Sequence, residues 1–124
     1  MEKKEHVGYP VDMELSKYEV RFWADGDCMD SPDAPIRIKN GQRILAHKYD
    51  GVFNPYGDIE SVKGKVCCIL YIAQGKRFGV VKEVMGIDEL TGTLRLKFYY
   101  PQVTIVLLKI DAIEEVYIVD GVEE

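Results

Sequence analysis

Residues 65–72 of this chain read KVCCILYI, and residues 77–85 read RFGVVKEVM after a turn at Gln74-Gly75. The first stretch is almost uniformly apolar, which is typical of a strand covered on both faces of a sheet. The second stretch is rich in β-branched valine, and the glycine turn returns the chain into it. The pair predicts two consecutive strands, of which the first is central.

Further extended segments lie on both sides of this pair. β-branched and aromatic residues predict strands at 18–23, 43–47, 93–99, 103–110 and 116–119, with a shorter extended piece at 36–38. The Asn40-Gly41 turn signal predicts a hairpin between the short piece and the strand that follows it. We therefore expect a mainly β domain of six or seven strands, curled like a β-barrel or packed as a sandwich.

Two segments fall outside this pattern. The polar residues 1–17, which include Gly8 and Pro10, predict an N-terminal arm, so that the folded domain is expected to span 18–124. Residues 50–63 form a long excursion, with one helical turn expected near 58–62.

Length and composition indicate a single globular domain. The chain has 124 residues, 47% of them hydrophobic and 30% charged, which suits one core. No apolar run approaches the roughly 20 residues that cross a bilayer, so we expect no membrane contact and a cytoplasmic location. The net charge of −5, from 16 basic and 21 acidic residues, argues against direct nucleic-acid binding, because such a surface repels phosphates.

Metal and cofactor sites find little support in the sequence. The three cysteines form no C-x-x-C pair, and the two histidines, His6 and His47, lie in unrelated contexts. The acidic cluster at residues 25–33 lacks the spacing of a calcium loop. The common phosphate-binding and dinucleotide-binding motifs are also missing. We expect no metal and no cofactor.

Cys28 is the first candidate for chemistry. It follows Gly26 and Asp27 and precedes Met29, between a predicted strand and a proline-containing loop. Such a position suits a nucleophile, provided that a base or a cation activates the thiol. The alternative is a small buried hydrophobic residue, which is a common role for free cysteine.

Lys82 is the second candidate. Alternation along residues 78–84 places it on one strand face with Val80 and Val84. An amine held among apolar groups is disfavoured in its charged form and can act as a base. The alternative is a lysine whose amine reaches water along an apolar edge.

Four motifs in this order resemble the C-terminal domain of LexA, UmuD and the phage repressors, a family related to bacterial signal peptidases. The motifs are GDCM at 26–29, NGQRIL at 40–45, VKGKV at 62–66 and GVVKEV at 79–84. The resemblance covers about residues 18–121. It implies a curled, mostly β peptidase fold that forms dimers.

The resemblance also implies roles for single residues. A serine followed by methionine attacks a peptide bond in that family, and a lysine from a later strand is its general base. By position, Cys28 is the nucleophile and Lys82 the base, while Gly26, Asp27 and Met29 form the surrounding turn. The Cys28 backbone N–H is one candidate oxyanion donor.

The sequence departs from the family in three places. A thiol replaces the hydroxyl, and a thiol beside an amine can form a thiolate–ammonium pair. Neither Ala-Gly nor Cys-Gly, the dipeptides cleaved in the family, occurs in this chain. The excursion at 50–63 is longer than the family turn and could cover the cleft or supply a partner surface.

Three functions therefore stay open. The first is a regulatory domain of transcription or stress response that dimerises or binds a protein partner and carries an altered Cys–Lys dyad. The second is an active Cys–Lys peptidase acting on itself or on another chain. The third is an unrelated β module that binds a protein or ligand through aromatic residues, including Tyr49, Phe53, Tyr56 and 99–101.

The apolar C-terminal strands predict self-association. An open edge of the kind expected at 103–110 and 116–119 is usually paired or covered. We expect a symmetric homodimer through this region.

Overall fold

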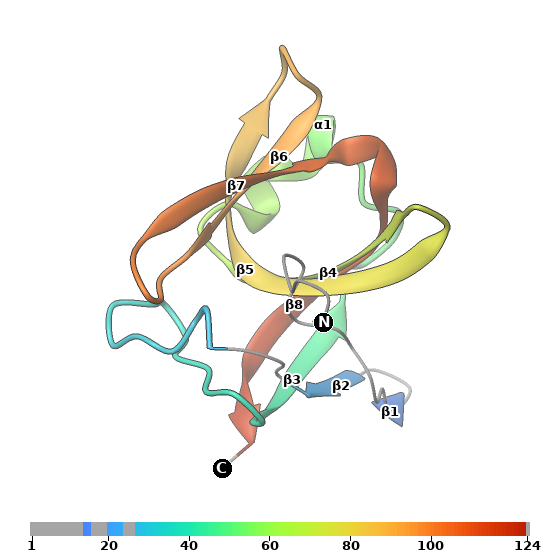
Figure 1. The fold of residues 1–124 in the computed structure, drawn as a ribbon. Coiled ribbons are helices and arrows are strands. Elements are labelled where there is room, and N and C mark those ends of the chain that lie inside the picture. Colours follow the sequence, from blue (N-terminus) through green and yellow to red (C-terminus); the bar gives the residue numbers. More distant parts are fainter. Residues whose placement is uncertain (1–13, 16–19, 24–26, 124) are drawn as a thin grey trace.

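The structure, a computed structural model, describes residues 14–15, 20–23 and 27–123, which form one antiparallel sheet, a short helix and connecting loops (Figure 1). Along the sheet the strands follow the order β1-β2-β3-β8-β4-β5-β6-β7. The elements are β1 (Glu14–Leu15), β2 (Val20–Trp23), β3 (Arg43–Lys48), α1 (Pro55–Val62), β4 (Val66–Ala73), β5 (Lys76–Asp88), β6 (Thr93–Phe98), β7 (Thr104–Lys109), the 3-10 turn η1 (Ile110–Ala112) and β8 (Ile113–Glu123).

The prediction of a mainly β domain is confirmed, but the expected barrel closure is wrong. β1 and β7 stand at the two ends of the strand order, and closure would require the end strands to pair. The ribbon of β5 nevertheless bends strongly between β4 and β6 (Figure 1). The sheet has eight strands rather than six or seven because the two-residue β1 lies within the predicted arm. The rest of residues 1–17 lies outside the described residues.

β4 is central, as its apolar sequence predicts. It pairs with β5 on one side and with β8 on the other, and residues 66–71 are all buried. The β4–β5 turn has positive φ at both Gln74 (54°) and Gly75 (75°), which matches the right-handed twist of a two-residue hairpin.

Side chains of β4 alternate between two apolar clusters. Cys68 and Leu70 belong to a cluster that also contains Met29 and Ile38 from the loop at 27–42. Cys67 and Ile69 belong to the other cluster, with Val62 from α1. The loop thus covers one face of the central strand and the helix covers the other.

The expected hairpin at Asn40-Gly41 is wrong, although the turn itself is present. Gly41 has φ +85°, a conformation that glycine adopts without a steric penalty. Residues 36–38 form no strand, however, and Ile38 N–H donates to the Met29 carbonyl instead. β3 pairs with β2 and β8.

The helical turn expected near 58–62 is a full helix, α1, that begins earlier. The Asn54 side chain accepts from Tyr56 N–H, Pro55 occupies the first turn, and Asp58 accepts from Asn54 N–H. These reciprocal capping bonds satisfy the free amides of the helix start.

The C-terminal strands divide into an edge and an interior. β8 is longer than the predicted 116–119 and lies between β3 and β4, so the expectation that it offers an open edge is wrong. β7 does lie at an end of the sheet and alternates half-buried with exposed residues. Among the described residues, no helix is long and apolar enough to span a membrane.

Truncation of a β4 side chain tests the central role of this strand. Ile69 is fully buried, and Ile69→Ala should lower the free energy of unfolding by about 2–5 kcal/mol because it leaves a cavity. Leu90, which is 98% exposed, is the control. Leu90→Ala should change the free energy of unfolding by less than about 0.5 kcal/mol. Urea denaturation measures both, and equal effects would contradict the assignment.

Candidate functional site: a thiol and a buried amine

The loop that carries Cys28 is anchored by its neighbour Met29. The Met29 side chain is only 2% exposed and lies in the core. Its carbonyl accepts from the N–H groups of Ser31 and Ile38 at 3.0 and 3.1 Å. Asp27 is exposed, and its carbonyl accepts from Asp30 N–H at 2.9 Å. The backbones of these two residues therefore shape the turn around Cys28, while Gly26 lies outside the described residues.

The end of β6 holds the backbone of Cys28 directly. The Cys28 carbonyl accepts from the N–H groups of Tyr99 and Tyr100 at 2.8 and 2.9 Å. Figure 1 shows the same arrangement, with the cyan loop beside the turn between β6 and β7. Cys28 is thus fixed on one side by the core and on the other by the sheet.

Lys82 lies on β5 and points its amine at this thiol. Its Nζ is 3.4 Å from Cys28 Sγ, although the two residues are 54 positions apart in the chain. The side chain is 3% exposed, so it does not reach water as an edge lysine would. Nζ also lies 4.5 Å from the centre of the Phe98 ring, where a cation is favoured by the ring electrons.

Sheet geometry makes room for the thiol. β6 pairs with β5 only from Glu83 onward, so the loop at Cys28 occupies the place beside β5 that β6 has left. The Cys28 thiol is 3.7 Å from the Val81 carbonyl, to which it can donate. The sulfur therefore has a hydrogen-bond acceptor and an amine donor on the same strand.

This arrangement meets the distance requirement for proton transfer between the two side chains. The amine is within reach of the thiol proton, which is the minimum geometric requirement for a base and its nucleophile. Cys28 is half-buried, so a reagent can approach the sulfur while the amine stays sheltered. The sequence candidates Cys28 and Lys82 are brought together.

The other two cysteines are in a different environment. Cys67 and Cys68 are both buried. Burial raises the pKa of Cys67 to about 12 and that of Cys68 well above its ordinary value, because the thiolate is poorly solvated in the core. Of the three thiols, only Cys28 is placed to react.

Tyr99 and Glu83 form a second polar pair beside the first. The Tyr99 hydroxyl donates to the Glu83 carboxylate, and Lys97 Nζ lies 4.9 Å from the Tyr99 ring centre. Glu83 follows Lys82 in the sequence, and it is buried as well. The sequence predicts Tyr99 at the end of the strand 93–99 and among the aromatic residues of a binding surface. Strand alternation places Glu83 on the same face as Val81, and that shared apolar face was the available signal for a buried carboxylate.

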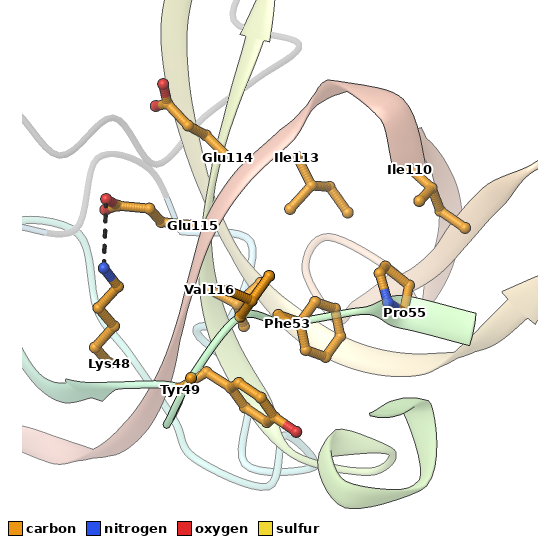
Figure 2. A pocket seen from close by; sticks show the side chains of 11 residues that line it. Lys48, Tyr49, Phe53, Pro55, Ile110, Ile113, Glu114, Glu115 and Val116 are labelled. Atoms are coloured by element: carbon orange, nitrogen blue, oxygen red, sulfur yellow. Dashed lines mark ion pairs between the residues drawn. The ribbon is translucent and has the colours of Figure 1, made fainter. Parts of the chain in front are cut away.

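A cavity lies elsewhere, at the excursion. It has a volume of about 290 Å³ and is lined on one side by Tyr49, Phe53 and Pro55 and on the other by Ile113 and Val116 (Figure 2). Tyr49 and Phe53 meet edge to face at 5.0 Å, and Lys48 pairs with Glu115 at its rim at 3.7 Å. Neither Cys28 nor Lys82 lines this cavity. The cavity is therefore separate from the thiol–amine pair.

Comparison with protein-family models, curated proteins and solved structures found no match. Within the part of the chain that the structure describes, no three His, Cys, Asp or Glu side chains are grouped to hold a metal ion. The assignment of a function therefore depends on the geometry of the thiol–amine pair.

The Tyr99–Glu83 pair predicts a specific pH dependence of stability. Burial, followed by the Glu83 hydrogen bond, raises the pKa of Tyr99 to about 12 from 10.0. Because the folded pKa is the higher one, the stabilisation is complete below pH 10.0 and is lost as the pH rises toward about 12. Tyr99→Phe should therefore be less stable than the unsubstituted protein by about 1 kcal/mol near neutral pH.

Urea denaturation at about pH 8 and about pH 11 checks this, since the difference should shrink at the higher pH. Tyr100→Phe is the matched control and should change the free energy of unfolding by less than about 0.5 kcal/mol. A Tyr99→Phe difference that stays constant with pH would contradict the assigned hydrogen bond.

Proposed function

We propose that this chain is a regulatory domain of LexA-like peptidase fold in which Cys28 and Lys82 are the altered form of the family's serine–lysine dyad. The observation that carries the proposal is the 3.4 Å contact between Cys28 Sγ and Lys82 Nζ. Both residues were selected from the sequence by their motif positions. Their meeting is what the resemblance requires.

Burial and hydrogen bonding support a functional pair over a chance contact. An amine that is 3% exposed loses its hydration and needs compensating contacts. Among the described residues, Lys82 finds them in a sulfur atom and an aromatic ring. The loop around Cys28 is meanwhile fixed by four backbone bonds, to the Met29 carbonyl from Ser31 and Ile38 and to the Cys28 carbonyl from the two residues that follow β6.

An active Cys–Lys peptidase is the second candidate, because the same contact is the starting geometry that this chemistry requires. Lys82 would take the thiol proton, Sγ would attack a peptide carbonyl, and the proton would pass to the leaving amine. Water would then hydrolyse the thioester. The absence of Ala-Gly and Cys-Gly from the sequence favours the regulatory role for this chain over self-cleavage.

The third hypothesis is an unrelated module that binds through aromatic residues. It would be favoured if Cys28 and Lys82 lay on opposite sides of the molecule. The structure instead has them in contact. Tyr49 and Phe53 do line the cavity at the excursion, which makes that cavity the candidate partner surface of the regulatory domain.

Alkylation of Cys28 tests the proposed dyad. Iodoacetamide reacts with the thiolate, and a neighbouring amine that accepts the proton raises the thiolate fraction. Lys82→Met keeps a long apolar side chain and removes the amine, so it should slow alkylation of Cys28 by about tenfold or more. Peptide mass spectrometry over time gives the rate.

Lys97→Met is the matched control, because this half-buried lysine of β6 contacts the Tyr99 ring and not the thiol. Its alkylation rate should equal that of the unsubstituted protein. Equal rates for all three proteins would remove the basis of the dyad. Intact mass after long incubation separates the two leading functions, since cleavage products would favour the peptidase.

Self-association through β7 is the second part of the proposal. Among the described residues β7 pairs only with β6, and it exposes Ile105 (40%) and Leu107 (53%). An exposed apolar edge of this kind invites a second strand, and a second copy placed antiparallel would satisfy the symmetry of a dimer.

Leu107→Lys should raise the dimer dissociation constant by about tenfold or more, because like charges would meet across the symmetric edge. Leu90→Lys is the matched control, since Leu90 is equally apolar, exposed and outside β7. Light scattering over a concentration series measures both. A monomeric unsubstituted protein at high concentration would contradict this part.

A further inference from the structure

The sulfur and nitrogen of the candidate dyad face each other with no intervening group. Nζ of Lys82 is 3.4 Å from Cys28 Sγ, and the lysine stem is flexible enough to approach further. We infer that Cys28 and Lys82 form a reversible redox switch, in which hydrogen peroxide oxidises the thiol and the amine then closes a sulfur–nitrogen bond. The inference rests on the same pair as the proposed function and concerns its regulation.

Selectivity follows from where the thiols lie. Peroxide attacks a thiolate that it can reach, and Cys28 alone of the three cysteines is not fully buried. Cys67 and Cys68 are shielded by the core, and their raised pKa values disfavour the reactive form. Oxidation should therefore begin at Cys28.

The chemistry balances with one equivalent of peroxide. The Cys28 thiol is oxidised to a sulfenic acid, and one oxygen of the peroxide leaves as water. Lys82, which took the thiol proton, gives it to the hydroxide that leaves the peroxide, and this completes the first water. The freed amine then attacks the sulfur, the sulfenic hydroxyl leaves with an amine proton as a second water, and a sulfenamide remains. Two hydrogens are lost overall, one from the thiol and one from the amine.

The fold favours ring closure over other fates of the sulfenic acid. The amides of Tyr99 and Tyr100 and the buried Met29 hold the backbone of Cys28 in place, which keeps the sulfur within reach of the amine. Cys68 belongs to the apolar cluster against which Cys28 packs, and Cys67 lies opposite Lys82 in the strand register. A disulfide from Cys28 to either cysteine is therefore the main competing product.

Closure would inactivate both members of the pair at once. The sulfur would no longer be a nucleophile, and the nitrogen would no longer be available as a base. Thiols reduce such a bond and release both groups. The site would thus respond to peroxide without further oxidation of the sulfur.

Peptide mapping of the full chain tests the switch. The protein is treated with one equivalent of hydrogen peroxide, its free thiols are blocked with N-ethylmaleimide, and it is digested with trypsin without reductant. We expect the tryptic peptide 22–37, which contains Cys28, to be joined to the peptide 78–95 with cleavage at Lys82 lost. The joined mass should fall below the sum of the two peptides by about 2 Da, and dithiothreitol should separate them.

Two variants serve as controls. Lys82→Met and Cys28→Ser should each abolish the joined species under the same treatment. In the unsubstituted protein, Cys28 oxidised but unlinked, or linked to the peptide 66–76 that carries Cys67 and Cys68, would overturn the inference. Because this outcome is read from the unsubstituted protein, it holds even if a variant fails to fold.

The result is separable from that of the proposed function. Alkylation that depends on Lys82 without any joined species would leave the dyad standing and remove the switch. If the joined species forms but the alkylation rate of Cys28 does not change in Lys82→Met, the switch would stand and the proposed dyad would be removed.

Discussion

Burial of β4 on both faces is the constraint on which the other features of this molecule depend. Its side chains alternate between two apolar clusters, and each cluster needs a cover that the sheet cannot supply. α1 covers one face through Val62, and the loop at 27–42 covers the other through Met29 and Ile38. An apolar strand of this kind is stable only when both covers are in place, because each exposed side chain would lose the free energy of its burial.

The candidate site is a consequence of the second cover. Met29 is held in the core, so its neighbour Cys28 is carried to a fixed place beside β5. β6 stops pairing with β5 at Glu83, and the loop takes the vacated position, with its carbonyl bound by the amides that follow β6. Packing and backbone hydrogen bonding therefore set the distance between sulfur and nitrogen, and the same packing shelters the amine from water.

The two polar pairs at this corner share elements and differ in character. Cys28–Lys82 joins the loop to β5, and Tyr99–Glu83 joins the residue after β6 to the next position of β5. Lys82 and Glu83 are consecutive, so strand alternation directs them to opposite faces. The backbone of Tyr99 also holds Cys28, which links the stability of the tyrosine–carboxylate pair to the position of the thiol. The cavity at the excursion is separate from this corner and is built from Tyr49, Phe53 and the start of β8.

Local sequence was sufficient for the elements whose signals are short-range. The uniform apolar run of β4, the turn at Gln74-Gly75 and the valines of β5 each reflect steric and solvation preferences of neighbouring residues. Those preferences also placed Lys82 on the strand face shared with Val80. The start of α1 was missed because Asn54-Pro55 can begin either a loop or a helix. The bond that the Asn54 amide donates to the Asp58 carboxylate, together with the Asn54 side-chain cap, favours the helix.

Strand partners, by contrast, depend on contacts between distant segments. The insertion of β8 between β3 and β4 left β7 at an end of the sheet and kept the sheet open, which no local pattern specifies. The Asn40-Gly41 turn likewise has the same local conformation whether or not it closes a hairpin. The sequence alone thus determined a central strand, its turn and two candidate residues, since these follow from local preferences. Only tertiary structure decided that Cys28 touches Lys82, because their distance depends on packing between segments far apart in the chain.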